Sequence, residues 1–443
     1  MKLLFLDVYK KSFSRISKDT AGGYGTENDL GDGIFGKSLS FIVKNLIFWP
    51  NLSFVQLMQE FKNLGHSVKY KKHVGSYTHS GEWDAIFICS SIVCFETELL
   101  AVNNILKKQA VPIFLCGSFP QFSEIKIPKG ATMLSGNYEF LPQKLLNEDQ
   151  NLLDLAKKKF IAVAEGNSDE LGQIEWSSMN LPKNKNMVLG KGKSYIPFLT
   201  SRGCPYSCKE YCTYPTTQGS KVRRQSNDES IKKLKSIATE FPNSHVVFRD
   251  PVFSLNIKET KELLKKIIIS DINLSFSAEL HLRNIDDEFI DLCKEANFSG
   301  LKFGIESALP EVRDSVKRFS VTNDVQKQMI SKINRAGLKS IGMFILAQPE
   351  DTEETCNKTI DYACSLDLSV AQFSIFTPYP GTPFYYGNRK LIRENRFENF
   401  NQYSLVFKHD SISSQQARNL LEKSYKRFLF SKGKKKMLSI FTS

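Results

Sequence analysis

The sequence contains no long hydrophobic run. None of its stretches reaches the roughly 18 uninterrupted apolar residues that a membrane-spanning helix requires. The most apolar stretch, residues 40–58, is interrupted by polar residues and proline, among them Lys44, Pro50 and Asn51. The apolar run at residues 3–6 is too short for the core of a secretory signal and is typical of a first β-strand. These absences predict a cytoplasmic protein.

A disulfide framework is not expected either. Nine cysteines without a secretory signal indicate a reducing compartment, in which disulfides rarely persist. Hydrophobic residues make up 41% of the chain and charged residues 24%, which is ordinary for a globular protein. A length of 443 residues suffices for two or three domains, each with its own core.

Acidic residues are fewer than basic ones, and the formal net charge is +13. A lysine-rich solvated surface is the simplest explanation; attraction to an anionic substrate, nucleic acid, lipid surface or acidic reductant is the alternative. The charge gathers near the C-terminus, where these cations alternate with aromatic residues and leucine: Lys423, Lys426, Arg427, Lys432, Lys434, Lys435 and Lys436. We predict a solvated capping helix there, with peripheral membrane contact through this basic helix as the alternative.

The first part of the chain alternates short apolar runs with helical patterns. Helices are expected at 54–64 and 96–108, and strands at 3–8, 85–89, 112–116 and 131–134. This order predicts an α/β fold whose N-terminal domain, residues 1–145, is doubly wound and Rossmann-like. The ligand crevice of such a domain lies at the carboxyl ends of its strands. Residues 146–190 are polar and predict a linker with one helix at 152–163.

Six further strand–helix units follow. Strands are expected at residues 195–201, 245–248, 274–278, 300–303, 340–346 and 371–376. They predict a partial parallel (β/α)6 barrel over residues 191–385, with its active site at the carboxyl rim of the strands. Residues 386–443 form the basic helical C-terminal extension.

Three cysteines, Cys204, Cys208 and Cys212, come directly after the first barrel strand. Thiols this close do not pair efficiently as disulfides, and an odd number of them favours a soft metal. No histidine lies nearby, which disfavours a closed zinc site. Three thiolates leave one corner of a cubane iron–sulfur cluster open, whereas an electron-transfer cluster uses four. The pattern therefore predicts an iron with an open position for a ligand.

Over residues 1 to about 390 the chain resembles the radical S-adenosylmethionine (SAM) superfamily, and more closely the subgroup with an N-terminal cobalamin-binding domain. The strongest motif runs from Ser201 to Cys208 and continues to Tyr211-Cys212; residues 304–307, 349–352 and 378–382 support it. The resemblance implies that the three cysteines hold a 4Fe–4S cluster. Its open iron would bind SAM, which one electron cleaves to a 5′-deoxyadenosyl radical.

The cysteine spacing departs from that of the family. Here it is CxxxCxxxC instead of CxxxCxxC, and we expect the extra residue to bulge within the loop. The family's Gly-Gly-Glu motif at the second strand is replaced by residues 248–253, where Asp250 is the substitute for binding the SAM amine, with capping as the alternative. The other implied SAM contacts are Tyr211 beside the adenine, Glu279 and Glu306 or Ser307 toward the ribose hydroxyls, and Arg318 against the methionine carboxylate.

The resemblance implies cobalamin as a further cofactor, although the first loop, residues 7–33, contains no histidine to ligate its cobalt. Small residues that follow the strands of the N-terminal domain are the cobalamin-binding candidates, with ordinary turn chemistry as the alternative: Ser90, Ser91, Gly117, Ser118 and Gly136. The glycines at positions 22, 23 and 25 predict a loop that covers the substrate.

The function that the resemblance implies is cobalamin-dependent methyl transfer to an unactivated carbon of a small-molecule or lipid-linked substrate. A low-potential reductant such as ferredoxin or flavodoxin would supply the electron. Radical oxidation or cyclisation without methyl transfer is the main alternative, and a regulator with a vestigial radical site is a remote one. A transfer-RNA methylthiotransferase would need a second cluster on Cys89, Cys94 and Cys116, two of which fall within predicted strands. Nucleic acid is therefore not an expected partner.

Overall fold

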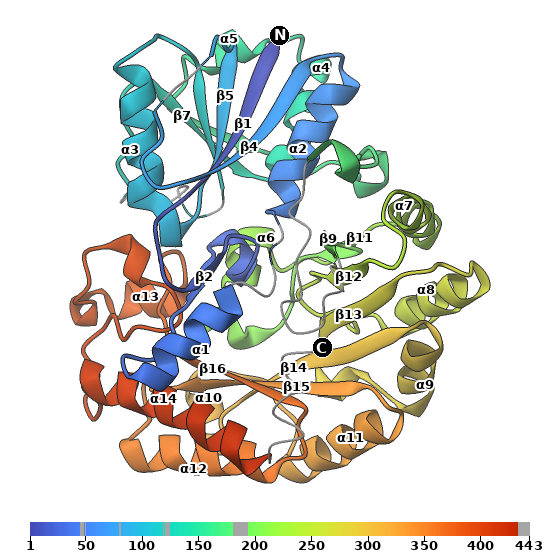
Figure 1. Ribbon diagram of the computed structural model, residues 1–443, viewed down its shortest axis with the longest axis vertical. Helices are drawn as coiled ribbons and strands as arrows, with labels where there is room; N and C mark the ends of the chain where they lie inside the picture. The colour runs from blue at the N-terminus through green and yellow to red at the C-terminus, as the bar shows by residue number, and fades with distance from the viewer. Residues whose placement is uncertain are drawn as a thin grey trace.

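Two parallel six-stranded sheets form the centres of two α/β domains, one above the other in Figure 1. The computed structural model describes residues 1–44, 48, 50–78, 81–117, 119, 125–179 and 194–432. The predicted fold class, a doubly wound domain followed by a partial parallel barrel, is confirmed.

The first sheet has the strand order β4-β1-β5-β6-β7-β8, and all of its neighbours are parallel. Because the order reverses between β1 and β5, a ligand crevice is expected at the carboxyl ends of these strands. The strands are β1 (Lys2–Tyr9), β4 (Ser67–Val74), β5 (Ala85–Cys89), β6 (Ile113–Cys116), β7 (Ala131–Gly136) and β8 (Phe160–Val163). The helices are α2 (Leu52–Asn63), α3 (Phe95–Leu106), α4 (Leu141–Asn147) and α5 (Leu152–Leu155).

Two strands of this sheet differ from the sequence-based expectation. The helix predicted at 152–163 ends at Leu155, and β8 follows as an edge strand whose Ile161 and Val163 point into the core. The first sheet therefore extends past the predicted domain end at residue 145. Strand β4 was not predicted because its lysines alternate with half-buried residues, a pattern typical of a solvated edge strand.

All six predicted barrel strands are confirmed, in the order β16-β15-β14-β13-β12-β9. They are β9 (Tyr195–Phe198), β12 (His245–Phe248), β13 (Ser275–Leu280), β14 (Phe298–Glu306), β15 (Lys339–Leu346) and β16 (Val370–Ile375). The larger helices outside them are α7 (Asn227–Glu240), α8 (Ile257–Ile269), α9 (Asp287–Glu295), α11 (Asn323–Arg335) and α12 (Glu353–Ser365). On β13, Phe276, Ala278 and Leu280 are buried in the core beneath these helices, so the alternate positions Ser277 and Glu279 face the barrel interior.

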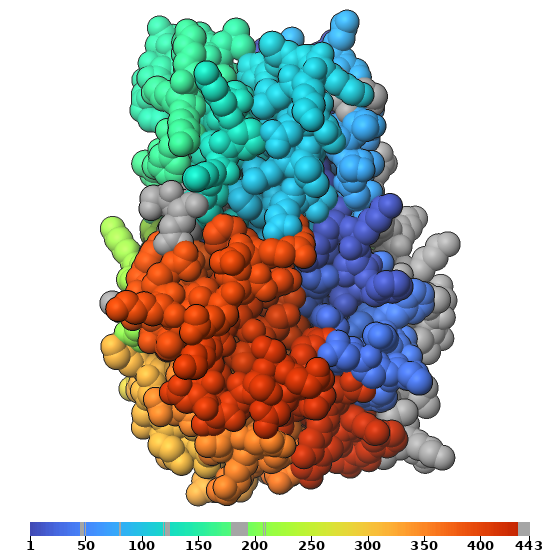
Figure 2. Space-filling model, turned by 90° about the vertical axis from the view of Figure 1, so that its left-hand side faces the viewer, coloured from blue at the N-terminus to red at the C-terminus, as the bar shows by residue number. Residues whose placement is uncertain are grey.

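Between β1 and α2 the chain leaves the first domain and lies against the barrel side of the molecule (Figure 1). This N-terminal arm, residues 10–44, contains β2 (Arg15–Ser17), β3 (Thr26–Asn28) and α1 (Ile34–Lys44). It is tied to the C-terminal part of the chain, where Tyr24 donates to the Pro380 carbonyl at 2.6 Å and stacks on Tyr379. Figure 2 shows the arm in blue beside the red C-terminal segment.

The C-terminal extension contains α13 (Pro383–Gly387) and α14 (Ser414–Ser431). Helix α14 buries Leu420, Leu421 and Phe428 against the barrel, which is the capping position predicted for it. Of its predicted cations, Lys434, Lys435 and Lys436 lie outside the described residues. Within the described part of the chain, no helix is long and apolar enough to span a membrane.

Candidate cluster and cofactor site

The three cysteines lie on one tight loop after β9. Cys204 and Cys208 are 4% and 3% exposed, and Cys212 is partly exposed. The extra residue of the CxxxCxxxC spacing is taken up by a helical turn, η7 (Ser207–Glu210), in which the Cys212 amide donates to the Cys208 carbonyl at 2.9 Å. This turn holds Cys208 and Cys212 together through their backbones. The predicted bulge is thus one turn of helix.

The three thiols do not form a site for a single metal ion within the described residues. Within the described residues, no three His, Cys, Asp or Glu side chains converge closely enough to bind one metal ion. A cubane cluster does not need such convergence, since each thiolate ligates a different iron. A mononuclear zinc site would need four ligands around one point.

Gly203 sets the start of the cysteine loop. Its φ of 86° lies in the left-handed region, and a Cβ at this position would collide with the carbonyl oxygen of Lys221. The Cys204 amide then donates to the Gly219 carbonyl at 3.0 Å, which closes the loop on itself. Glycine is therefore required immediately before the first cysteine.

Asp250 holds the base of this loop. Its carboxylate is fully buried at the end of β12 and accepts hydrogen bonds from the Thr200 amide at 3.1 Å, the Thr200 hydroxyl at 2.5 Å and the Ser201 hydroxyl at 2.6 Å. Three donors from the loop are typical of a capping carboxylate. Binding of the SAM amine by Asp250 stays a prediction, and its main contacts here are internal.

Arg318 faces the cysteines from the loop after α10 (Pro310–Ser315). Its Nη1 lies 3.9 Å from Cys208 Sγ and its Nε 3.4 Å from Glu306 Oε1. The hydrogen bond from Cys212 and the nearby guanidinium of Arg318 lower the pKa of the Cys208 thiol, whereas burial raises that of Cys204 to about 11. Thiolate is the metal-binding form of cysteine, so the charge of Arg318 favours ligation at Cys208.

Glu306 and Ser307, which the sequence left as alternatives, point in different directions. The register between β14 and β15 shifts near Glu306, whose φ is 68°, and its carboxylate faces Arg318. The Ser307 hydroxyl instead lies 3.1 Å from that of Thr359 on α12, on the helix side of the sheet. Glu306 is therefore the better placed of the two, and its contact with ribose stays a prediction.

Glu279 lies at the carboxyl end of β13 with two cations that the sequence analysis missed. Arg249 Nη1 and Lys302 Nζ lie 3.0 Å and 3.2 Å from its carboxylate. Burial alone would raise the pKa of Glu279, but Lys302 and Arg249 together lower it to about 2. Arg249 also contacts Asp19 of the arm at 3.2 Å. Side chains alternate between the two faces of β12, and continuing this alternation one residue past the strand places Arg249 in the barrel interior. That alternation is the sequence signal that could have identified Arg249.

Tyr211 occupies the position before the third cysteine as expected. Its ring packs against Phe376, with centroids 5.8 Å apart, just beyond the end of β16. The tyrosine therefore connects the cysteine loop to the last barrel strand. Its contact with adenine stays a prediction.

A cavity that is open to solvent lies between the carboxyl ends of β6 and β7 and the barrel. Gly22, Gly23, Gly117 and Gly136 line it, together with side chains of α6 (Thr213–Gln218). Gly136 has a φ of 76°, and a Cβ there would approach the Val163 carbonyl oxygen to 2.6 Å. At these four glycines the lining is bare backbone, which would let a broad, flat ligand such as a corrin approach closely.

The candidates Ser90 and Ser91 are not part of this cradle. Ser90 and Ser91 are buried and bind the carboxylate of Glu98, to which the Ser90 hydroxyl donates at 2.8 Å. Their side chains do not line the cavity. Ser118 lies outside the described residues. Cobalamin contact by any of these residues stays a prediction.

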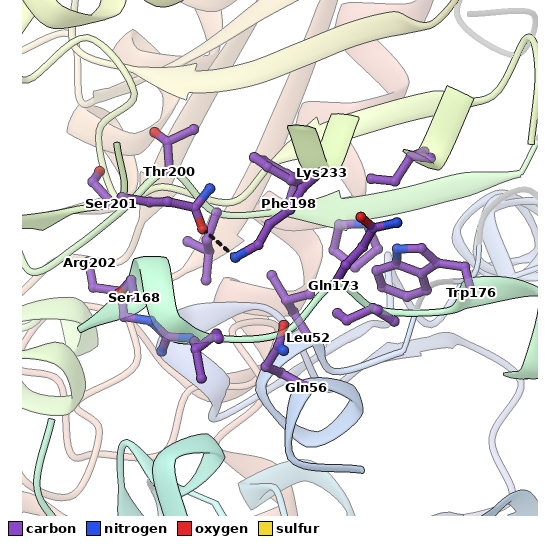
Figure 3. Close-up of a pocket in the computed structure, with 16 residues that line it drawn as sticks. Leu52, Gln56, Ser168, Gln173, Trp176, Phe198, Thr200, Ser201, Arg202 and Lys233 are labelled. Atoms are coloured by element: carbon purple, nitrogen blue, oxygen red, sulfur yellow. Dashed lines mark hydrogen bonds between the residues drawn. The ribbon is translucent and has the colours of Figure 1, made fainter. Parts of the chain in front are cut away.

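A second cavity lies at the domain junction, between α2, the segment 168–176 and β9 (Figure 3). Trp176 and Phe198 form apolar walls, and Lys233 donates to Gln225 at 2.8 Å. None of the three cluster cysteines lines either cavity, but α6, which begins at its cap Cys212, lines only the glycine-lined one. The chemistry is therefore expected at the glycine-lined cavity and the cysteine loop.

Comparison with known proteins agrees with this geometry. Residues 198–363 match the model of the Radical SAM superfamily. An uncharacterized methyltransferase of Pyrococcus horikoshii is 29% identical over 53% of this chain and 51% of its own length. Bacteriochlorophyllide d C-12(1)-methyltransferase of Chlorobaculum tepidum is 23% identical over 51% of this chain and 49% of its own. The chain thus spans about half the length of the curated relatives it matches.

Two solved structures share the fold over both domains. The radical SAM methyltransferase TsrM of Kitasatospora setae, with cobalamin and a [4Fe-4S] cluster bound, aligns with a TM-score of 0.58 at 13% identity, covering 88% of this chain and 74% of TsrM. The cobalamin-dependent SAM radical enzyme OxsB, with aqua-cobalamin and SAM bound, aligns with a TM-score of 0.65 at 14% identity, covering 95% and 66%. Residues 198–363 of this chain are therefore similar to the radical SAM superfamily, and the chain has the two-domain fold of these cobalamin-binding structures.

Proposed function

We propose that this chain is a cobalamin-dependent radical SAM enzyme that transfers a methyl group to an unactivated carbon. The observation that carries the proposal is the short helix α6, which begins at its cap Cys212 and lines the glycine-rich cavity with Tyr214, Thr217 and Gln218. The cluster site and the cavity are thus adjacent. When bound, the cluster and SAM supply the radical and cobalamin carries the methyl group.

The residues of the chain would hold these groups and exclude water. Cys204, Cys208 and Cys212 would ligate three irons and leave the fourth for SAM. Arg318 and Glu306 form an ion pair beside the cysteines. On binding, the carboxylate of SAM would contact Arg318, and an amine or hydroxyl of SAM would contact Glu306, in place of this pair. Glu279 stays ionised at neutral pH, so it is an acceptor ready for ribose hydroxyls.

Methyl transfer is favoured over other radical reactions by the relatives. Besides the two methyltransferases above, a tryptophan 2-C-methyltransferase of Streptomyces laurentii is 25% identical over 41% of this chain. An anaerobic magnesium-protoporphyrin IX monomethyl ester cyclase of Rubrivivax gelatinosus, 20% identical over 59%, supports cyclisation as the second candidate. The substrate class that we propose is a small or lipid-linked molecule, with ferredoxin or flavodoxin as reductant in the cytoplasm.

A methylthiotransferase is a weaker candidate, although a putative one of Methanocaldococcus jannaschii is 23% identical over 62% of this chain. Cys89 and Cys116 lie opposite each other on the neighbouring strands β5 and β6 and are buried in the main core. Cys94 belongs to a different core cluster. Three thiols divided between two cores do not present a common face for a second cluster.

The test is anaerobic reconstitution of the full chain, grown with cobalamin, followed by analysis of iron, sulfide, bound corrin and 5′-deoxyadenosine formed from SAM. Cys208→Ala should lose cluster iron and 5′-deoxyadenosine formation. Cys364→Ala, which removes a partly exposed thiol on α12, should retain both. Unchanged turnover in Cys208→Ala would remove the cluster assignment. If the wild-type protein binds the cluster but no corrin, cobalamin-dependent methyl transfer is excluded, and a radical oxidoreductase is the function that remains.

A further inference from the structure

Large hydrophobic side chains gather on the outer surface of the N-terminal arm. On α1, Ile34 is 88% exposed, Phe41 57% and Ile42 42%. Phe13, at 84% exposed, lies near the other end of the helix, since Lys44 of α1 donates to the Ser12 carbonyl. Exposed hydrophobic residues are usually scattered singly, so several along one helix mark an interaction surface.

The exposed face of α1 is also basic. The helix buries Gly36, Leu39 and Ser40 on its inner side, whereas Lys37 and Lys44 are exposed with the apolar residues. No aspartate or glutamate occurs between Ile34 and Lys44. An apolar face flanked only by lysines is complementary to an anionic surface.

The end of α14 continues this surface. Phe430 is 65% exposed and stacks on Phe35 of the arm, with ring centroids 6.4 Å apart; Lys426, one turn earlier, is exposed. Figure 2 shows the two segments side by side. We call the set Phe13, Ile34, Lys37, Phe41, Ile42, Lys44, Lys426 and Phe430 the arm surface.

The acidic groups closest to the arm surface are engaged by other residues. Arg418 binds Asp29 at 3.0 Å and Asp32 at 2.8 Å, and Glu422 accepts the Gly33 amide at 2.8 Å. The predicted membrane contact through α14 alone is less favourable, because its Arg427 pairs with Asp361. Lys37 and Lys44 of α1, together with Lys426, add positive charge to the arm surface.

We propose that the arm surface binds peripherally to an anionic lipid bilayer. The exposed isoleucine and phenylalanine side chains would insert at the level of the headgroups, and the lysines would contact lipid phosphates. A contact made by a few partly inserted side chains and by charge is reversible. It places the protein at a source of lipid-linked substrate and does not depend on which reaction the cluster performs.

Flotation of the full chain with vesicles tests this. Wild-type protein should float with vesicles of phosphatidylglycerol and phosphatidylcholine, and far less with phosphatidylcholine alone. Ile34→Ser should weaken binding about ten-fold, because it removes a large inserted apolar side chain. Ile269→Ser is the matched control, since Ile269 is 83% exposed at the end of α8, and it should bind as wild type.

A second pair of variants tests how much the positive charge of the arm surface contributes to vesicle binding. Lys37→Glu should weaken binding at least about five-fold at low salt and much less at high salt, whereas Lys258→Glu on α8 should have no effect. Equal flotation of all variants, or no flotation of the wild type with anionic vesicles, would overturn the proposal. So would a dimer that forms without lipid and is lost in Ile34→Ser, because the surface would then bind a second copy. Circular dichroism confirms that each variant is folded.

Discussion

At the scale of single residues, the barrel interior is defined by charge pairs that are far apart in the sequence. Arg249, Glu279 and Lys302 come from the ends or interiors of three neighbouring strands. The alternation of side chains between the two faces of each strand turns these three charged groups toward one another in the barrel interior. Glu279, at the end of its strand, was implied by the family resemblance, whereas nothing in the sequence singled out Lys302.

Glu279→Gln should destabilise the folded protein by about 2 kcal/mol at pH 7, because two partly buried cations lose their carboxylate. The pKa of Glu279 in the folded state is lowered to about 2, so its stabilising contribution is present above the pKa of the unfolded chain and lost as the pH falls toward 2. Urea unfolding measured from neutral to acidic pH should show the difference between variant and wild type shrinking only below about pH 4.5. Glu288→Gln, at an exposed surface ion pair, should show no measurable difference.

At the scale of elements, the cysteine loop is a rigid unit in which each part constrains the next. Asp250 fixes the end of β9 through Thr200 and Ser201, Gly203 allows the reversal, and the turn η7 aligns Cys208 with Cys212. A spacing with one more residue than the usual motif therefore still presents three thiols on one loop.

Gly203→Ala should lower stability by more than about 3 kcal/mol and reduce cluster iron, because both the left-handed backbone and the Lys221 carbonyl oppose a Cβ. Gly65→Ala is the matched control: its φ is 82°, but no atom lies within 4 Å of the added Cβ. That variant should cost only about 1 kcal/mol and keep full iron content. Thermal unfolding and iron analysis measure both, and equal losses in the two variants would contradict the role of the close contact.

At the scale of the whole molecule, the N-terminal arm connects the two domains. Lys18 of the arm is 1% exposed and lies 3.0 Å from Asp7 and 2.8 Å from Glu98, both in the first domain. One residue later, Asp19 binds Arg249 of the barrel. The arm therefore fixes how the glycine-lined cavity faces the cysteine loop.

Lys18→Met should destabilise the protein by about 3–5 kcal/mol at neutral pH, since it leaves two buried carboxylates without their cation. Burial raises the pKa of Glu98, and the charge of Lys18 opposes that effect. The loss of stability in the variant should therefore lessen as the pH falls and the carboxyl of Glu98 becomes protonated. Denaturant unfolding at several pH values measures this. Lys157→Met, at a solvent-exposed pair with Asp154, should unfold like the wild type throughout.

The sequence by itself determined the two α/β domains, the six barrel strands and the cysteine loop, because hydrophobic periodicity and short-range motifs are local properties of the chain. It did not reveal β4 or β8, whose edge positions are decided by the strands beside them. Only the tertiary structure separated Glu306 from Ser307 and directed Ser90 and Ser91 to Glu98. It also brought residues 10–44 onto the barrel, because such contacts depend on pairing across hundreds of residues that no local pattern encodes.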